Sequence, residues 1–354
     1  MVWALAAGAA GGMASLIRPL DGVLVIGLLG LWAIGLDGRS LRVRFATLAA
    51  FVVGTAALGA LVLPYNQRLT GDPTQFPIMV YEDQRFAPNA NAYGFGPDRG
   101  MGWPIDPFPG HGPRDALINA NLNTFQLNTE LFGWSAGSLG LAALMLFCGR
   151  LRKSDYLMLA VIAVNFAAYF FYYFSGGPDF GARYWYVMLV PLIALTIGGA
   201  RTLAQKIESG PAEVWRGAAG FRVTVAVGAL SVFALANYFP WRATDKYHHY
   251  LRMRPDIRYL AREYRFGKSL VLIRGEEHPD YASAAVYNPL DLRADPLESV
   301  YVRDRSPEVR AQALQAYADR PVWIVEGPSI TGGGYEVIAG PLPAHEFGES
   351  RGAE

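Results

Sequence analysis

Arginine, tyrosine and amide side chains stand at the ends of long apolar runs in this chain. Arg18 lies between two such runs, and Arg183 immediately precedes another. A fixed arginine stabilises the phosphate group that leaves in a group transfer. The pattern therefore favours transfer from a phosphate-linked donor. The candidates for binding that donor share a position beside an apolar run: Arg18, Arg183, Tyr65, Asn66 and Tyr184.

Group transfer to a hydroxyl also needs a proton acceptor, and carboxylates most often serve this purpose next to arginines. Asp72 and Glu82 follow the third apolar run and are the candidates for that catalytic role. The alternative for these residues, and for most of the charges around them, is a solvated loop charge with no chemistry.

The composition indicates a lipid environment. Hydrophobic residues make up 52% of the 354 residues and charged residues only 17%, whereas soluble domains carry about 25% charged residues. The apolar residues fall in runs of roughly 15 to 20, the length of a membrane-spanning helix. Seven runs qualify as spans: Val2–Ile17, Gly22–Leu36, Ala46–Pro64, Trp134–Gly149, Tyr156–Phe174, Trp185–Ala200 and Val223–Pro240.

Basic residues orient these spans, because short cytoplasmic loops of membrane proteins collect Lys and Arg. The basic clusters follow the second, fourth and sixth runs and alternate as this rule requires: Arg39, Arg42 and Arg44; Arg150, Arg152 and Lys153; Arg201, Lys206, Arg216 and Arg222. The opposite, outer face then receives Arg18–Asp21, the long loop 65–133, the loop 175–184 and the tail from Trp241. The chain is thus predicted to be a multi-pass integral membrane protein in contact with membrane lipids.

The first two spans are short, so the connection Arg18–Asp21 should lie below the outer membrane surface. Ionisable groups at such depth usually face a polar cavity and mark a site. The alternative is an arginine that extends to the headgroups or pairs with Asp21. In the long loop, Asp115–Leu131 mixes leucines with asparagines, a pattern typical of a helix that lies in the membrane interface.

After Pro240 the composition becomes that of a soluble domain. The short branched runs Leu270–Ile273, Val300–Arg303 and Val322–Val325 predict strands, and Pro307–Ala318 predicts a helix. The predicted fold is an all-α transmembrane bundle of about seven spans over residues 1–240, followed by a small α/β extracytoplasmic domain over residues 241–354.

Several other functions are excluded or disfavoured. A net charge of +1 lacks the basic stripe that nucleic-acid binding needs. Cys148 is the only cysteine, and no two histidines have the spacing of a zinc site. No metal site and no cofactor are therefore predicted, although a divalent metal remains compatible with the chemistry.

The chain also resembles the GT-C superfamily of membrane glycosyltransferases, in the dolichyl-phosphate-mannose-type and RgtA/B/C/D-like bacterial branch. The segments that carry the resemblance are short: Gly11–Pro19, which ends in Arg-Pro; Pro64–Pro77 with Tyr93–Pro97; Gly181–Leu195, which contains Arg-Tyr followed by Pro; and parts of the tail at Asn288–Pro289, Val300–Asp304 and Asp319–Trp323.

This resemblance implies an inverting transfer of a sugar from a polyprenyl-phosphate lipid to a glycan or protein acceptor in the bacterial cell envelope. It places the chain in the inner membrane with its C-terminal domain outside the cytoplasm. The catalytic carboxylate of the family lies in the first outer loop after the first span, and no residue here matches it by motif. The resemblance therefore predicts that the sequence is the C-terminal portion of a longer protein.

Two alternatives remain open at this level. One is a transporter or flippase for a lipid-linked glycan, which inverted repeats or broken helices would favour. The other is a non-catalytic assembly partner, which the missing first-loop acid would favour.

Overall fold

The computed structural model describes residues 1–33, 45–101, 110–174, 176, 181–210, 217–289, 291–292 and 297–344. The chain forms two compact units, Met1–Phe239 and Pro240–Glu354. The basic residues Arg39, Arg42, Arg44 and Arg216 lie outside the described residues.

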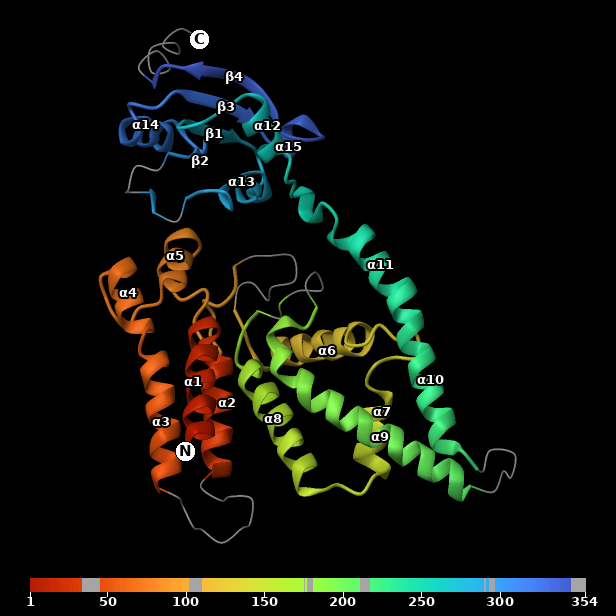
Figure 1. Cartoon of the computed structure of the whole chain (residues 1–354). Helices are drawn as coiled ribbons and strands as arrows, with labels where there is room; N and C mark the ends of the chain where they lie inside the picture. Colours follow the sequence, from red (N-terminus) through yellow and green to blue (C-terminus); the bar gives the residue numbers. More distant parts are fainter. Residues whose placement is uncertain are drawn as a thin grey trace. The chain divides into compact units, whose positions relative to one another are not determined.

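The first unit is helical (Figure 1). Its elements in chain order are α1 (Val2–Ile17), α2 (Pro19–Ala33), α3 (Phe45–Gly59), α4 (Val62–Thr70), α5 (Pro77–Arg85), α6 (Pro113–Glu130), α7 (Gly140–Cys148), α8 (Lys153–Phe170), the 3₁₀ helix η1 (Arg183–Met188), α9 (Leu189–Ser209) and α10 (Ala219–Phe233).

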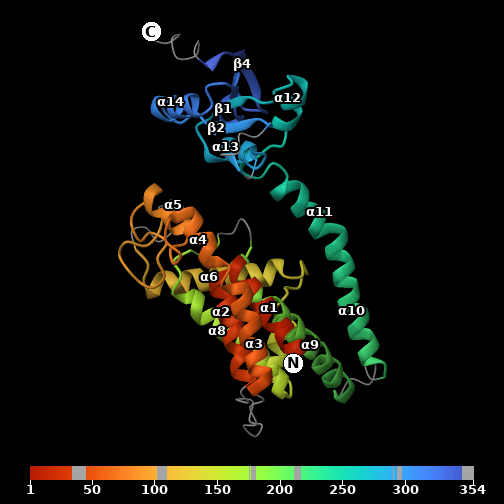
Figure 2. The same cartoon turned by 60° about the vertical axis from the view of Figure 1, so that its left-hand side comes forward.

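Glycines allow two pairs of these helices to pack backbone against backbone. A Cβ atom built on Gly54 of α3 would lie 2.3 Å from the carbonyl oxygen of Leu5 in α1. A Cβ atom on Gly199 of α9 would lie 1.8 Å from the carbonyl oxygen of Leu141 in α7. Small residues at such crossings are typical of helix packing in membranes. Figure 2 shows α1, α2 and α3 side by side from a second direction.

Three helical stretches within the described residues are long and apolar enough to cross a membrane: Phe45–Thr70, Arg183–Ser209 and Ala219–Tyr247. They coincide with the third, sixth and seventh predicted spans. The first two predicted spans correspond to the shorter apolar helices Val2–Ile17 and Pro19–Leu31. A predominantly helical chain with three helices long and apolar enough to span a membrane and with a small C-terminal sheet is thus confirmed, whereas the full set of seven spans is not shown.

Two segments differ from their prediction. The helix from Ala219 continues to Tyr247, past the predicted end at Pro240. π-Helical turns at Ala234–Tyr238 (η3) and Arg242–Tyr247 (η4) flank α11 (Phe239–Trp241) and accommodate the missing donor of Pro240. The segment predicted as the long loop 65–133 contains an additional helix, α5, with Pro77 at its first position. The helix predicted over Asp115–Leu131 is present as α6.

The second unit is a small α/β structure around a four-stranded sheet of order β2-β1-β3-β4. Its elements after η4 are the 3₁₀ turn η5 (Tyr250–Arg252), α12 (Ile257–Glu263), β1 (Leu270–Arg274), α13 (His278–Ala285), β2 (Val300–Arg303), α14 (Pro307–Ala316), β3 (Val322–Glu326), α15 (Pro328–Thr331) and β4 (Glu336–Leu342). The three strands predicted from the sequence are parallel, and β4 joins β3 in the antiparallel direction.

Both faces of this sheet are covered. Val271 and Ile273 pack with Ile257 of α12 and Ala284 of α13 on one face. Leu270 and Leu272 pack with Ala313 of α14 on the other face. A strand covered on both sides is apolar throughout, which explains why the β1 sequence reads as an unbroken apolar run.

Candidate functional site

Arg18 occupies the junction between α1 and α2. Its backbone is extended (φ −141°, ψ 96°), and Pro19 starts the next helix. One guanidinium nitrogen lies 3.7 Å from the carboxylate of Asp21, so the ion pair considered from the sequence is present. The same guanidinium donates a hydrogen bond to the carbonyl oxygen of Arg183, 165 residues further along the chain. Arg18 is therefore joined both to its own helix and to η1.

The carboxylate of Asp21 is buried between these helices and α8. Its Oδ1 accepts a hydrogen bond of 2.6 Å from the hydroxyl of Tyr169. Asp21 thus holds Arg18 on one side and Tyr169 on the other, which fixes the direction of the arginine. No pattern in the sequence predicted this contact of Tyr169.

Arg183 and Tyr184 lie in η1. The guanidinium carbon of Arg183 lies 5.2 Å from the centre of the Tyr184 ring and 5.5 Å from that of Phe174. The guanidinium carbon of Arg18 lies 5.1 Å from the centre of the same Tyr184 ring. Two arginines that are far apart in the sequence therefore meet at one aromatic ring, each at a distance typical of a cation–π contact.

Glu82 of α5 connects to this group through two other side chains. Its carboxylate accepts a hydrogen bond from the amide of Asn91. The amide oxygen of Asn91 accepts 2.7 Å from the hydroxyl of Tyr172, whose ring lies 5.5 Å from that of Tyr184. Burial raises the pKa of Glu82 above its ordinary value, against an opposing effect of the Asn91 hydrogen bond. A raised pKa makes the ionised carboxylate a stronger base.

Tyr65, Asn66 and Asp72 lie in α4 and the turn after it, and their described contacts are local. Tyr65 is 60% exposed. Asn66 donates a hydrogen bond of 3.1 Å to the carbonyl oxygen of Pro73. The exposed carboxylate of Asp72 accepts hydrogen bonds of 2.7 Å from both the hydroxyl and the backbone N–H of Thr74, which lower its pKa. The structure brings Arg18, Arg183 and Tyr184 together and connects Glu82 to them. Among the described contacts, none joins Tyr65, Asn66 or Asp72 to that group.

We call Arg18, Arg183 and the Tyr184 ring between them the arginine cluster. Within the described residues, no three His, Cys, Asp or Glu side chains are grouped closely enough to hold a metal ion. Asp179, another charge of the loop before η1, falls outside the described residues.

The second unit offers a different place for a ligand. In open α/β sheets, ligands bind at the carboxyl ends of the strands where the strand order reverses. Here that position lies between β1 and β3, and the side chain of Asp280 fills it. A Cβ atom built on Gly275 or on Gly327, which follow these strands, would lie 2.5 or 2.6 Å from Asp280 atoms.

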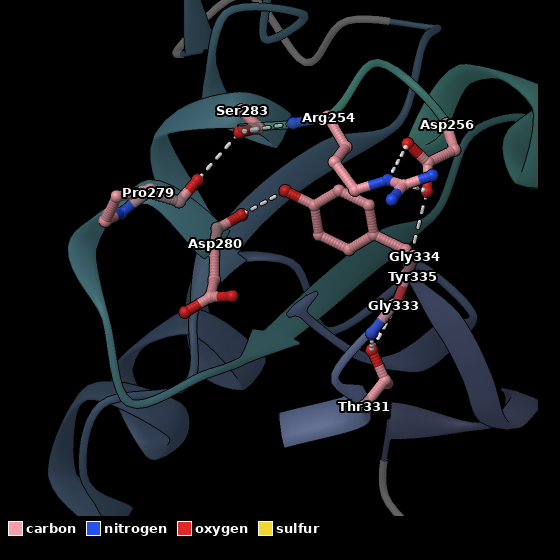
Figure 3. A network of polar contacts seen from close by, with 9 residues as sticks. All are labelled: Arg254, Asp256, Pro279, Asp280, Ser283, Thr331, Gly333, Gly334 and Tyr335. Carbon is pink, nitrogen blue, oxygen red and sulfur yellow. Dashed lines mark hydrogen bonds and ion pairs between the residues drawn. The ribbon is translucent and has the colours of Figure 1, made fainter. Parts of the chain in front are cut away.

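The carboxylate of Asp280 takes the hydrogen bonds that an anionic ligand would otherwise receive at this position. It accepts 3.0 Å from the backbone N–H of Glu277 and 2.9 Å from that of Ser329. Figure 3 shows the hydroxyl of Tyr335 directed at the main-chain carbonyl oxygen of Asp280. The position is closed by the protein itself, so the candidate site lies in the first unit.

Comparisons with models of protein families, with curated proteins and with solved structures found no match for this chain.

Proposed function

We propose that this chain is a membrane glycosyltransferase of GT-C type. It transfers a sugar from a polyprenyl-phosphate lipid to a glycan or protein acceptor outside the cytoplasm. The observation that supports this proposal is the arginine cluster, in which Arg18 and Arg183 meet at the ring of Tyr184. Two guanidinium groups held in fixed directions suit a lipid-linked phosphate, because each offers several N–H donors.

The proposal includes seven spans in a bacterial inner membrane, with the arginine cluster and the second unit at the outer face. The three long apolar helices and the two shorter ones support it. Further support comes from basic residues at helix ends far along the chain from the arginine cluster: Lys206 lies at the end of α9, and Lys153 lies at the start of another helix, α8.

The chemical step is a displacement at the anomeric carbon. The acceptor oxygen forms a bond to that carbon while the bond from the carbon to the phosphate oxygen breaks. The electron pair of the broken bond leaves with the polyprenyl phosphate, whose charge Arg18 and Arg183 stabilise. The proton of the acceptor hydroxyl passes to a carboxylate, and we assign this role to Glu82, because the Asn91–Tyr172 connection joins it to the arginine cluster. Asp72 is the weaker candidate, because its lowered pKa makes it a poorer base.

The test is transfer of a radiolabelled sugar from a polyprenyl-phosphate donor by the full chain in proteoliposomes. Replacing Arg18→Ala and Arg183→Ala together is expected to reduce the transfer rate by about 10²- to 10³-fold, the usual loss when charge stabilisation of a leaving group is removed. Arg68→Ala provides a matched control, since Arg68 is an exposed arginine of α4 in the same unit. It should retain the wild-type rate.

Three outcomes would contradict the proposal. Full activity of the double variant would remove the arginine cluster from the mechanism. Movement of the lipid-linked sugar across the bilayer with no transfer to any acceptor would instead indicate a transporter or flippase, and binding of partners without either activity would indicate an assembly protein.

A further inference from the structure

Helix α6 buries polar side chains and exposes apolar ones, the reverse of a helix in a water-soluble protein. It buries Asn119, Asn123 and Gln126 against the rest of the first unit, each at most 6% exposed. It exposes Leu117 and Phe125, at 62% and 65%. Burying amides while exposing large apolar side chains is unfavourable in water, so the buried amides need a reason of their own.

The buried face of α6 lines a small cavity next to the arginine cluster. Asn119 and Asn123 form one wall, and the aromatic rings of Tyr169, Tyr172 and Tyr184 form others. We call this space the amide pocket. The ring of Tyr184 separates it from Arg18 and Arg183, because the same ring contacts both arginines and lines the pocket.

The pocket contains a hydrogen-bond acceptor with no partner. The Nδ2 group of Asn119 donates 2.7 Å to the carbonyl oxygen of Tyr173, and that of Asn123 donates 2.9 Å to the carbonyl oxygen of Asn119. The Oδ1 atom of Asn123 is buried and has no partner among the described residues. Leaving such an atom unpaired costs about 1–3 kcal/mol, and a buried polar atom without a partner requires an explanation.

The combination of amides and aromatic rings suits a sugar. The hydroxyl groups of a sugar donate to amide oxygens, and its C–H faces pack against aromatic rings. We infer that the amide pocket binds the sugar of the lipid-linked donor, with a sugar hydroxyl donating to Oδ1 of Asn123. This inference rests on the proposed function and adds to it the residues that recognise the sugar.

The present size of the pocket indicates how the sugar enters. About 10 Å³ of it is open to the centre of a water molecule, which is room for about one water. A sugar therefore requires one wall to move. Tyr184 is that wall, because it is only partly buried and lies at the start of η1, where the next residue, Trp185, departs from helical geometry (φ −100°, ψ 17°). Rotation of this ring out of its position between the pocket and the arginines would join the pocket to the phosphate position.

The experiment compares the binding of a lipid phosphate with and without a sugar to the full chain in nanodiscs. The probes are undecaprenyl phosphate and undecaprenyl phosphate carrying mannose, glucose or arabinose. Asn123→Leu should weaken binding of the preferred sugar lipid about 10-fold, which is the loss of one hydrogen bond in a buried site. It should leave binding of undecaprenyl phosphate unchanged. Gln126→Leu, on the same buried face of α6 but outside the pocket lining, is the matched control and should change neither affinity.

Stability separates binding from folding in this test. Asn123→Leu removes one hydrogen bond within α6, from Nδ2 to the carbonyl oxygen of Asn119, and also removes the unpaired Oδ1. These two effects oppose each other, so the unfolding temperature should change little and a loss of sugar binding would be local. Tyr184→Ala removes the proposed wall and should accelerate association of the sugar lipid.

The outcomes distinguish an error in the proposed function from an error in the assignment of the amide pocket. If undecaprenyl phosphate itself fails to bind the wild-type chain, the proposed function is wrong. If it binds but no sugar increases its affinity, or if Asn123→Leu weakens both ligands equally, the assignment of the amide pocket is wrong while the arginine cluster stands.

Discussion

In the second unit, the carboxylate of Asp304 is fully buried and accepts hydrogen bonds of 3.1 Å from Arg274 and 2.7 Å from Arg310. Asp280 is paired with two backbone N–H groups. In the first unit, by contrast, Asn123 and Asn165 keep buried amide atoms that have no partner among the described residues. Paired polar groups stabilise one structure, whereas unpaired ones cost stability and favour a ligand.

This contrast has a physical origin. The second unit fills the position where its strand order reverses with the side chain of Asp280, and the hydrogen bonds of that carboxylate serve folding. In the first unit, the unpaired amide of Asn123 lines a pocket with several tyrosines, and the ring of one of them, Tyr184, contacts two arginines. Functional sites commonly retain such local violations at the expense of stability.

The largest expected effect is the loss of a paired carboxylate in the second unit. Asp304→Ala leaves Arg274 and Arg310 without their shared partner and should lower the local free energy of unfolding by about 3 kcal/mol. Native-state hydrogen exchange of the β1 amides in the full chain measures this change. Asp319→Ala is the control, because the pair of Asp319 with Lys268 is exposed and contributes less than about 1 kcal/mol. Equal effects of the two changes would contradict the role given to burial.

The same change of residue type, Asn→Leu, should change the stability of the two units in opposite directions. Asn288→Leu removes hydrogen bonds of 2.9 and 2.7 Å to the backbone of Tyr301 and should destabilise the second unit by about 2 kcal/mol. Asn165→Leu removes an amide with neither atom partnered and should stabilise the first unit by about 1 kcal/mol. Unfolding of the full chain by sodium dodecyl sulfate and hydrogen exchange of α8 measure the second change. Destabilisation by Asn165→Leu would mean that the amide has a structural partner.

The smallest effect at neutral pH concerns Tyr335. Burial raises the pKa of this tyrosine to about 12 in the folded chain, from an ordinary value of 10.0. The folded state therefore holds the phenolic proton more tightly than the unfolded state. This contribution to stability is complete below pH 10 and is lost as the pH rises towards 12. Tyr335→Phe should cost about 1 kcal/mol at pH 7 through the lost hydrogen bond to Asp280, and should flatten the fall in stability between pH 10 and 12.

Hydrogen exchange of β4 across this pH range measures the effect. Tyr301 also has a raised pKa in the same unit, so part of the fall should persist in the variant. An unchanged pH dependence would contradict the assignment to Tyr335.

Much of the fold could be predicted from the sequence because it depends on composition and period. Apolar runs predicted the long helices, and the branched runs at Leu270, Val300 and Val322 predicted the first three strands. Strand β4 was missed, because its exposure alternates irregularly and its sequence contains Gly340 and Pro341. The helix past Pro240 was also missed, because π turns can absorb a proline that usually ends a helix.

The candidate site was only partly predictable. The position of Arg18 between two apolar runs indicated a site from sequence alone, because a charge at that depth is costly. The amide of Asn165 within an apolar run is costly for the same reason and also indicates a site. The spacing of Asn119 and Asn123, four residues apart, places both amides on one face of α6. No local pattern, however, joins Glu82 to Tyr172 through Asn91.

By itself, the sequence determined which segments are apolar, which segments form the three parallel strands, and which charged residues stand at the ends of apolar runs. These properties depend on neighbours within a few residues. Only the tertiary structure decided that Arg18 and Arg183 share the ring of Tyr184, and that Asp72 remains in its own turn. Such contacts depend on how helices far apart in the chain pack together, and no local pattern specifies that packing.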